Sequence, residues 1–144
     1  MGREGFPGAG PWVPDRLSLS SIRTHAEQCR GCELHQEATK GGDGDGPESA
    51  ALMVVGGATR RQGGPRGRVL RRPSRWQVTA CEPWLLAELE VVRPRVVGVL
   101  GATAGQAVFG PSFRVGESRG RRLGWPGDRA PLRARARGCP SSRR

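Results

Sequence analysis

The chain of 144 residues has no tyrosine and no asparagine, and Lys40 is its one lysine. It contains no run of about 18 apolar residues, so we expect no transmembrane helix. Its first residues lack the apolar stretch of a secretory signal, and Phe6 stands where a myristoylation signal carries serine or threonine. These absences predict a cytoplasmic protein that has no membrane partner.

Apolar residues are scarce as well. The hydrophobic content is 35%, whereas glycine and proline reach 23 and 12 residues. Such a composition is typical of a chain with irregular ends around a modest core. We expect one domain, with residues 1–16 as a disordered lead and residues 123–144 as a basic, disordered tail.

Positive charge comes almost entirely from arginine. Lys and Arg number 24 against 13 Asp and Glu, which gives a formal net charge of +11. The planar guanidinium suits phosphates and base edges, so a polyanion is a reasonable partner, and nucleic acid is the commonest one. A coding bias toward Arg, Ala, Gly and Pro would produce the same composition, and composition alone leaves both explanations open.

The order of periodic segments predicts an α/β fold. Short apolar runs at 51–57 and 95–101 are typical of buried parallel strands, and helical spacing is expected at 17–29, 74–94 and 102–110. A strand, helix, strand order requires a crossover and a parallel sheet.

The helix predicted at 74–94 has clear signals at both ends. Ser74 and Gln77 form a capping box, Pro94 stops the helix, and Pro83 is expected to bend it or split it in two. Its predicted apolar face is formed by Val78, Cys81, Leu85, Leu89 and Val92.

The segment 58–75 has seven arginines and no acid. A right-handed crossover would place it beside residues 101–104 at the carboxyl edge of the sheet, where such folds bind ligands. The segment is either a solvated charge run or a loop that faces phosphates.

The cysteines allow several interpretations. Cys29 and Cys32 form a C-x-x-C pair, and Cys139 lies in the basic tail. Zinc or iron–sulfur ligation, a redox pair and free thiols all remain open. Ligation needs four donors, and the candidates are Cys29, Cys32, Cys81, His25 and His35. No pair of carboxylates and no Ser/His/Asp arrangement stands out, so the residues alone indicate a binding surface more clearly than an active site.

Three stretches resemble the iron–sulfur uracil-DNA glycosylases of family 4. They are "CRGCELHQEAT", "ALMVVGG" and "TACEPWLLAELEVVRPRVVGVLGATAGQAVFG". The stretch "RVLRRPSRWQVTAC" is similar to a loop of the UdgX-type branch, which binds uracil-containing DNA covalently. The resemblance covers residues 17–122.

The resemblance implies a three-layer α/β/α fold with a central parallel sheet. Here the sheet is expected to be incomplete, because the domain at 17–122 has an internal deletion near 58–72. The resemblance also implies a [4Fe–4S] cluster, with Cys29, Cys32 and Cys81 at three ligand positions and the fourth ligand not identified.

The site positions implied by the resemblance are degenerate. The turn at Gly56 and Gly57 lacks the family's acid and proline, and Leu70 stands where the UdgX-type branch has its nucleophilic histidine. A leucine cannot attack a sugar carbon. The DNA-facing arginines that remain are Arg68, Arg71, Arg72 and Arg75.

The implied function is therefore that of a uracil-DNA glycosylase-like DNA repair protein, a hydrolase of N-glycosidic bonds, with impaired or absent activity. Its partner would be uracil-containing, preferably single-stranded DNA, which it would bind as a monomer. One alternative is a basic DNA-binding remnant without catalysis, and another is a non-functional product.

Overall fold

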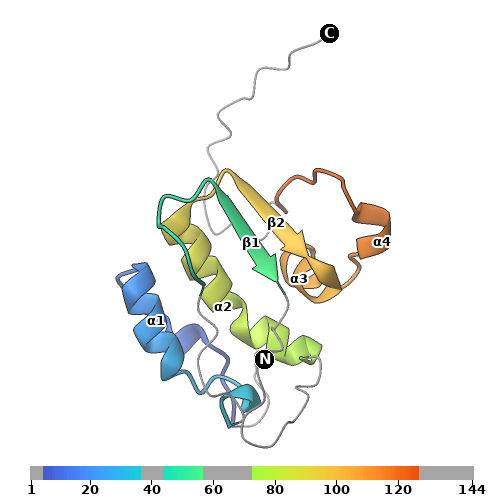
Figure 1. Cartoon of the computed structure of the whole chain (residues 1–144). Coiled ribbons are helices and arrows are strands. Elements are labelled where there is room, and N and C mark those ends of the chain that lie inside the picture. Colours follow the sequence, from blue (N-terminus) through green and yellow to red (C-terminus); the bar gives the residue numbers. More distant parts are fainter. Residues whose placement is uncertain (1–4, 37–43, 57–72, 127–144) are drawn as a thin grey trace, which may run out of the picture.

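The computed structural model describes residues 5–36, 44–56 and 73–126 (Figure 1). Two parallel strands, a long crossover helix and a C-terminal helical segment form one part of the molecule, and the N-terminal residues pack on the crossover helix. The elements are η1 (Gly10–Trp12), α1 (Leu19–Glu27), η2 (Glu33–Gln36), β1 (Leu52–Gly56), α2 (Arg75–Val92), β2 (Val96–Leu100), α3 (Gly101–Phe109) and α4 (Val115–Ser118).

Strands β1 and β2 pair in parallel, with a register that runs from Leu52 opposite Val96 to Gly56 opposite Leu100. Parallel neighbours cannot be joined by a hairpin, and α2 supplies the crossover. The predicted α/β class and the parallel pairing are therefore confirmed, in the form of a partial sheet of two strands within the described residues.

Helix α2 is continuous. Ser74 Oγ accepts a hydrogen bond from the Gln77 N–H, and Gln77 Oε1 accepts one from the Ser74 N–H, as the capping box predicts. Pro83 lies inside the helix without splitting it, so that alternative of the prediction is wrong. At the C-terminus Arg93 adopts a left-handed conformation (φ 48°) and its N–H donates to the Leu89 carbonyl.

The packed faces of α2 differ from the predicted face. Leu89 is buried as predicted, but the other buried residues are Ala80, Trp84 and Ala87, spaced four and three residues apart. The remaining predicted residues are only half-buried: Val78, Cys81, Leu85 and Val92. A single-sided amphipathic pattern fails because α2 packs against both α1 and α3.

The N-terminal residues contradict the prediction of a disordered lead over residues 5–16. The Gly8 N–H donates to the Gly31 carbonyl at 2.9 Å, and the Ala9 N–H donates to the Ala80 carbonyl at 2.8 Å. Ala9 is only 1% exposed and belongs to the same apolar cluster as Ile22 and Trp84. Backbone bonding to two distant segments orders this stretch in spite of its glycine and proline content.

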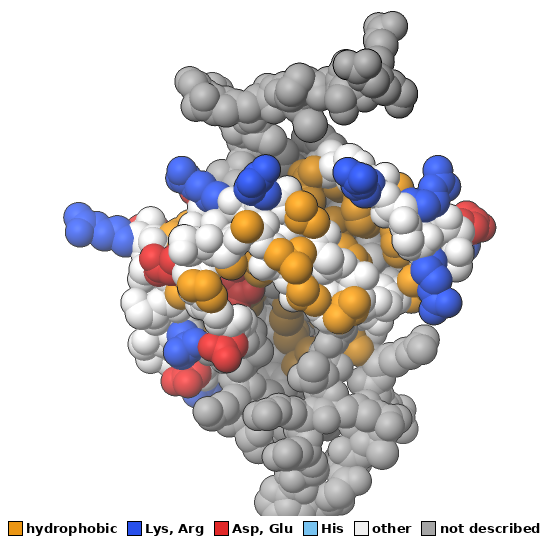
Figure 2. All heavy atoms as spheres, turned by 45° about the horizontal axis from the view of Figure 1, so that its top comes forward, with side chains coloured by type: hydrophobic (Ala, Val, Ile, Leu, Met, Phe, Trp, Pro, Cys, Tyr) orange, Lys and Arg blue, Asp and Glu red, His pale blue; other side chains and the backbone are white. Residues whose placement is uncertain are grey.

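One face of the two-stranded sheet is largely open among the described residues. Leu52, Val54, Val96 and Leu100 are between 55% and 63% exposed. Figure 2 shows apolar side chains gathered in the middle of one face of the molecule, with Arg side chains along its upper margin. The third layer of the expected α/β/α arrangement does not cover this face in the described part of the chain.

Within the residues that the structure describes, no helix combines the length and the apolar character needed to span a membrane.

Candidate functional site

The carboxyl ends of the two strands and the starts of two helices define one edge of the molecule. Gly56 and Leu100 are register partners, so β1 and β2 end together. Helix α3 begins directly at Gly101, whose φ of +86° favours glycine. Its N-cap residue makes no side-chain hydrogen bond, so the first backbone N–H groups of α3 have no side-chain cap.

Two of the predicted site residues at this edge lie in the described part. Gly56 ends β1, and Arg75 begins α2; both are exposed. The remaining predicted positions of the turn, the nucleophile and the arginine loop lie outside the described residues: Gly57, Arg68, Leu70, Arg71 and Arg72.

The three predicted ligand cysteines form a second group. Cys29 follows α1, Cys32 precedes η2, and Cys81 lies on α2. The sulfur atoms of Cys32 and Cys81 are 4.0 Å apart, although 49 residues separate them. The Gly31 N–H donates to Cys29 Sγ at 3.4 Å. The fold therefore joins the C-x-x-C loop to α2 through Cys32.

The loop that carries Cys29 and Cys32 is held in place by residues that the sequence pattern did not indicate. A Cβ on Gly31 would lie 2.5 Å from the carbonyl carbon and oxygen of Gly8. These two segments of the chain can therefore approach each other only because residue 31 is glycine. The next residue, Ala9, bonds to Ala80, the neighbour of Cys81. The glycine between the two cysteines was the available signal, but its partner at residue 8 could not be identified from spacing.

Burial and the neighbouring thiols change the pKa of Cys81. Burial, together with the smaller effects of the nearby Cys32 and Cys29, raises the pKa of Cys81 to about 12. The Cys81 thiol of the metal-free protein therefore keeps its proton at neutral pH, and a bound metal would have to displace it. A reactive redox thiol needs a lowered pKa, so Cys81 itself is not suited to that role.

The described residues do not complete a four-donor set. No group of three or more His, Cys, Asp or Glu side chains within them is arranged to hold a metal ion. Nδ1 of His25 and of His35 each donates to a backbone carbonyl, of Ser21 at 2.8 Å and of Cys32 at 2.7 Å. Thiols are the right donors for iron–sulfur or zinc, but three of them do not satisfy a four-ligand cluster.

A depression of about 360 Å³ lies elsewhere, lined by Leu17, Glu90, Val91 and Arg93. It is located at the C-terminal end of α2, the opposite end of that helix from Arg75. Its position at the amino end of the sheet separates it from the carboxyl edge, where parallel α/β folds bind ligands. We therefore do not assign it to the site.

Comparison with known proteins assigns this architecture to a family. The family model described as the uracil DNA glycosylase superfamily matches residues 49–135, which include both strands, α2, α3 and α4. The chain belongs to this superfamily.

A similar curated protein is the type-4 uracil-DNA glycosylase of Archaeoglobus fulgidus. It is 28% identical to this chain over 127 residues. The match covers 64% of this chain and 64% of the archaeal protein. The chain thus resembles a divergent type-4 protein and spans less than two thirds of that relative's length.

Proposed function

We propose that this protein is a uracil-DNA glycosylase-like DNA repair protein that binds uracil-containing, preferably single-stranded DNA at the carboxyl edge and is impaired in cleavage. The family match over residues 49–135 carries the proposal. The shared edge formed by Gly56, Gly101 and Arg75 supports it, because ligands of open parallel α/β folds bind there. We further propose that the protein acts as a monomer in the cytoplasm.

The chemistry available at the edge favours binding over catalysis. A uracil nucleotide has to be extruded from its stack before its glycosidic bond can be reached, at a cost of a few kcal/mol. The uncapped N–H groups at the start of α3 can stabilise negative charge that develops on the base. The turn at Gly56 and Gly57 contributes no acid, and Leu70 contributes no nucleophile.

The test is incubation of the purified chain with labelled single-stranded DNA that contains one uracil, followed by denaturing electrophoresis. Strand breaks after alkali would report released uracil, and a heat-stable shifted band would report a covalent adduct. We expect neither product, together with binding of the uracil strand in a native gel. A heat-stable band would show that Leu70 is wrongly aligned with the nucleophile, and absence of binding would reject the proposal.

The missing acid and the missing nucleophile also favour a second candidate, a basic DNA-binding remnant that does not recognise uracil. Under this alternative the protein binds strands with and without uracil equally. Native gels with matched thymine and uracil strands separate the two functions, since only the first predicts a preference for uracil.

We also propose an internal deletion near residues 58–72. The alignment with the archaeal protein extends over 127 positions, yet 64% of this chain is only about 92 of its 144 residues. Within the aligned region, the archaeal protein therefore has residues that lie opposite gaps in this chain. The sheet face that the described residues leave open supports the same interpretation.

Finally, we propose that Cys29, Cys32 and Cys81 hold a [4Fe–4S] cluster whose fourth ligand lies outside the described residues. The 4.0 Å separation of two of the three sulfur atoms supports a shared thiolate site. The measurement is iron content and broad visible absorption of the protein purified without oxygen. We expect Cys81→Ser to abolish both signals, with Thr79→Ser, an exposed position on the same helix, as the control; a colourless, iron-free parent would reject the cluster.

A further inference from the structure

Four exposed arginines follow α3 in the part of the chain that the structure describes. We call them the α4 arginine group: Arg114, Arg119, Arg121 and Arg122. Glu117 is the one acid between residues 110 and 123. Within the described residues no ion pair involves these four side chains. No acid in the described part of the chain therefore neutralises their positive charge, which is available to an anionic partner.

The backbone that carries the group is anchored on α3. The rings of Phe109 and Phe113 stack with centroids 5.3 Å apart. A Cβ on Gly105 would overlap the Phe113 ring, so this ring sits directly on the glycine surface of α3. The Phe113 N–H also donates to the Gly110 carbonyl at 3.1 Å. The aromatic contact thus fixes the start of the segment next to Arg114.

Helix α4 and the turn that follows it are held by backbone hydrogen bonds. The Ser118 N–H donates to the Arg114 carbonyl at 3.2 Å, and the Arg121 N–H donates to the Ser118 carbonyl at 3.1 Å. Gly120 has a φ of +72°, which only glycine adopts readily. Because the backbone is already ordered, binding through the arginines costs mainly side-chain entropy.

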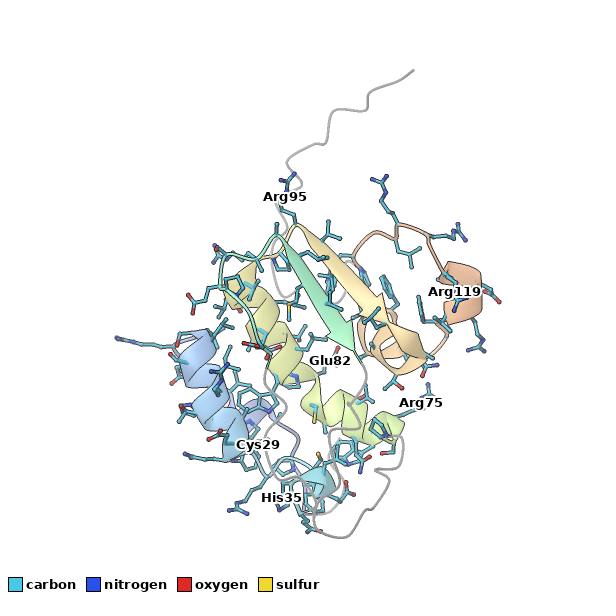
Figure 3. All side chains as sticks on the ribbon, viewed as in Figure 1. Cys29, His35, Arg75, Glu82, Arg95 and Arg119 are labelled. Carbon is cyan, nitrogen blue, oxygen red and sulfur yellow. The ribbon has the colours of Figure 1, made fainter. Side chains whose placement is uncertain are left out.

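Helix α3 lies between the carboxyl edge and the segment that carries the group. Figure 3 shows Arg75 near the carboxyl ends of the strands, Arg119 beside α4, and Arg95 at the opposite end of the strands. Helix α3 begins at the carboxyl edge and leads through Phe109 to the segment that carries the group. A strand whose target nucleotide occupies the edge would therefore reach the group by passing along α3.

We propose that the α4 arginine group binds the phosphate backbone of single-stranded DNA that extends from the carboxyl edge. This inference rests on the proposed function. The guanidinium fork matches phosphate oxygens. An acidic protein partner would more commonly be held by an aromatic or other large apolar anchor, and the exposed large apolar side chains of this described segment are Val115 and Leu123, neither of them aromatic.

The experiment measures fluorescence anisotropy of labelled single strands, with thymine or one uracil, across a salt series. Arg119→Gln/Arg121→Gln is compared with Arg16→Gln/Arg95→Gln, a control that removes the same charge from two exposed arginines elsewhere. Loss of two phosphate contacts should lower the affinity roughly sixtyfold at about 50 mM salt and flatten the log–log salt slope by about 1.4. The loss should be equal for both strands, because phosphate contacts do not read bases.

The possible outcomes separate this inference from the proposed function. If the parent prefers uracil and both double variants bind alike, the α4 arginine group has no role and the proposed function stands. If the parent shows no preference for uracil and only the α4 variant weakens, the group binds DNA and the proposed function fails. If the α4 variant loses as much affinity for labelled oligoglutamate as it loses for DNA, the group is an acidic-peptide site and the inference is overturned. A parent that binds neither strand overturns both.

Discussion

The N-terminal residues 5–36 and the two-stranded sheet differ in how well their apolar side chains are buried. The N-terminal residues bury a compact cluster against α2 that includes Ala9, Ile22 and Trp84. The sheet instead leaves four large aliphatic side chains more than half exposed. The part of the molecule that positions the cysteines is well packed, whereas the part that forms the carboxyl edge has a largely open face among the described residues. Stability should therefore depend mainly on the first region.

The largest test of this difference is Trp84→Ala. Trp84 is buried on α2 in contact with the cluster that includes Ile22 and Ala26. Removal of the indole should lower the free energy of unfolding by about 3–5 kcal/mol, because it leaves a cavity between α1 and α2. Urea unfolding followed by circular dichroism measures the change. A loss below about 1 kcal/mol would show that the N-terminal residues do not form the main core.

A smaller effect is expected from Gly31→Ala. The added Cβ would meet the backbone of Gly8 at 2.5 Å and push the N-terminal segment away from the cysteine loop. We expect a loss of about 1–3 kcal/mol, typical of overpacking at a close contact. Gly10→Ala is the matched control, since its Cβ would meet nothing within 4 Å. Equal stability of the two variants would show that the contact between residues 8 and 31 is unimportant.

The smallest change is expected on the open face of the sheet. Leu100→Gln replaces a side chain that is 63% exposed, so the free energy of unfolding should change by no more than about 0.5 kcal/mol. The same denaturant titration measures it. A loss of several kcal/mol would mean that this face is covered in the intact protein, and the contrast between the two regions would then disappear.

Much of the fold could be predicted because its signals are local. Alternation of short apolar runs with a capped helix indicated β1, α2 and β2, and Ser74 with Gln77 marked the start of α2 correctly. The buried face of α2 could not be predicted in the same way. Ala80 and Ala87 carry little apolar signal, and their burial depends on partners that lie far away in the chain.

The candidate site was predictable in part for the same reason. The resemblance selected Cys29, Cys32 and Cys81, and the structure brings Cys32 and Cys81 within 4.0 Å. The arginines of the loop were selected by charge alone, and of the four only Arg75 lies in the described residues. The α4 arginine group gained its significance only from the anchor that Phe113 makes on Gly105.

By itself the sequence determined the α/β order, the parallel strands, the positive charge and the cysteine spacing, because each depends on neighbouring residues or on composition. The tertiary structure alone decided that residues 5–16 are ordered, that Gly8 packs on Gly31, and that one face of the sheet is open among the described residues. The physical reason is that backbone hydrogen bonds and close contacts between distant segments depend on which surfaces meet, and no local pattern of side chains encodes that meeting.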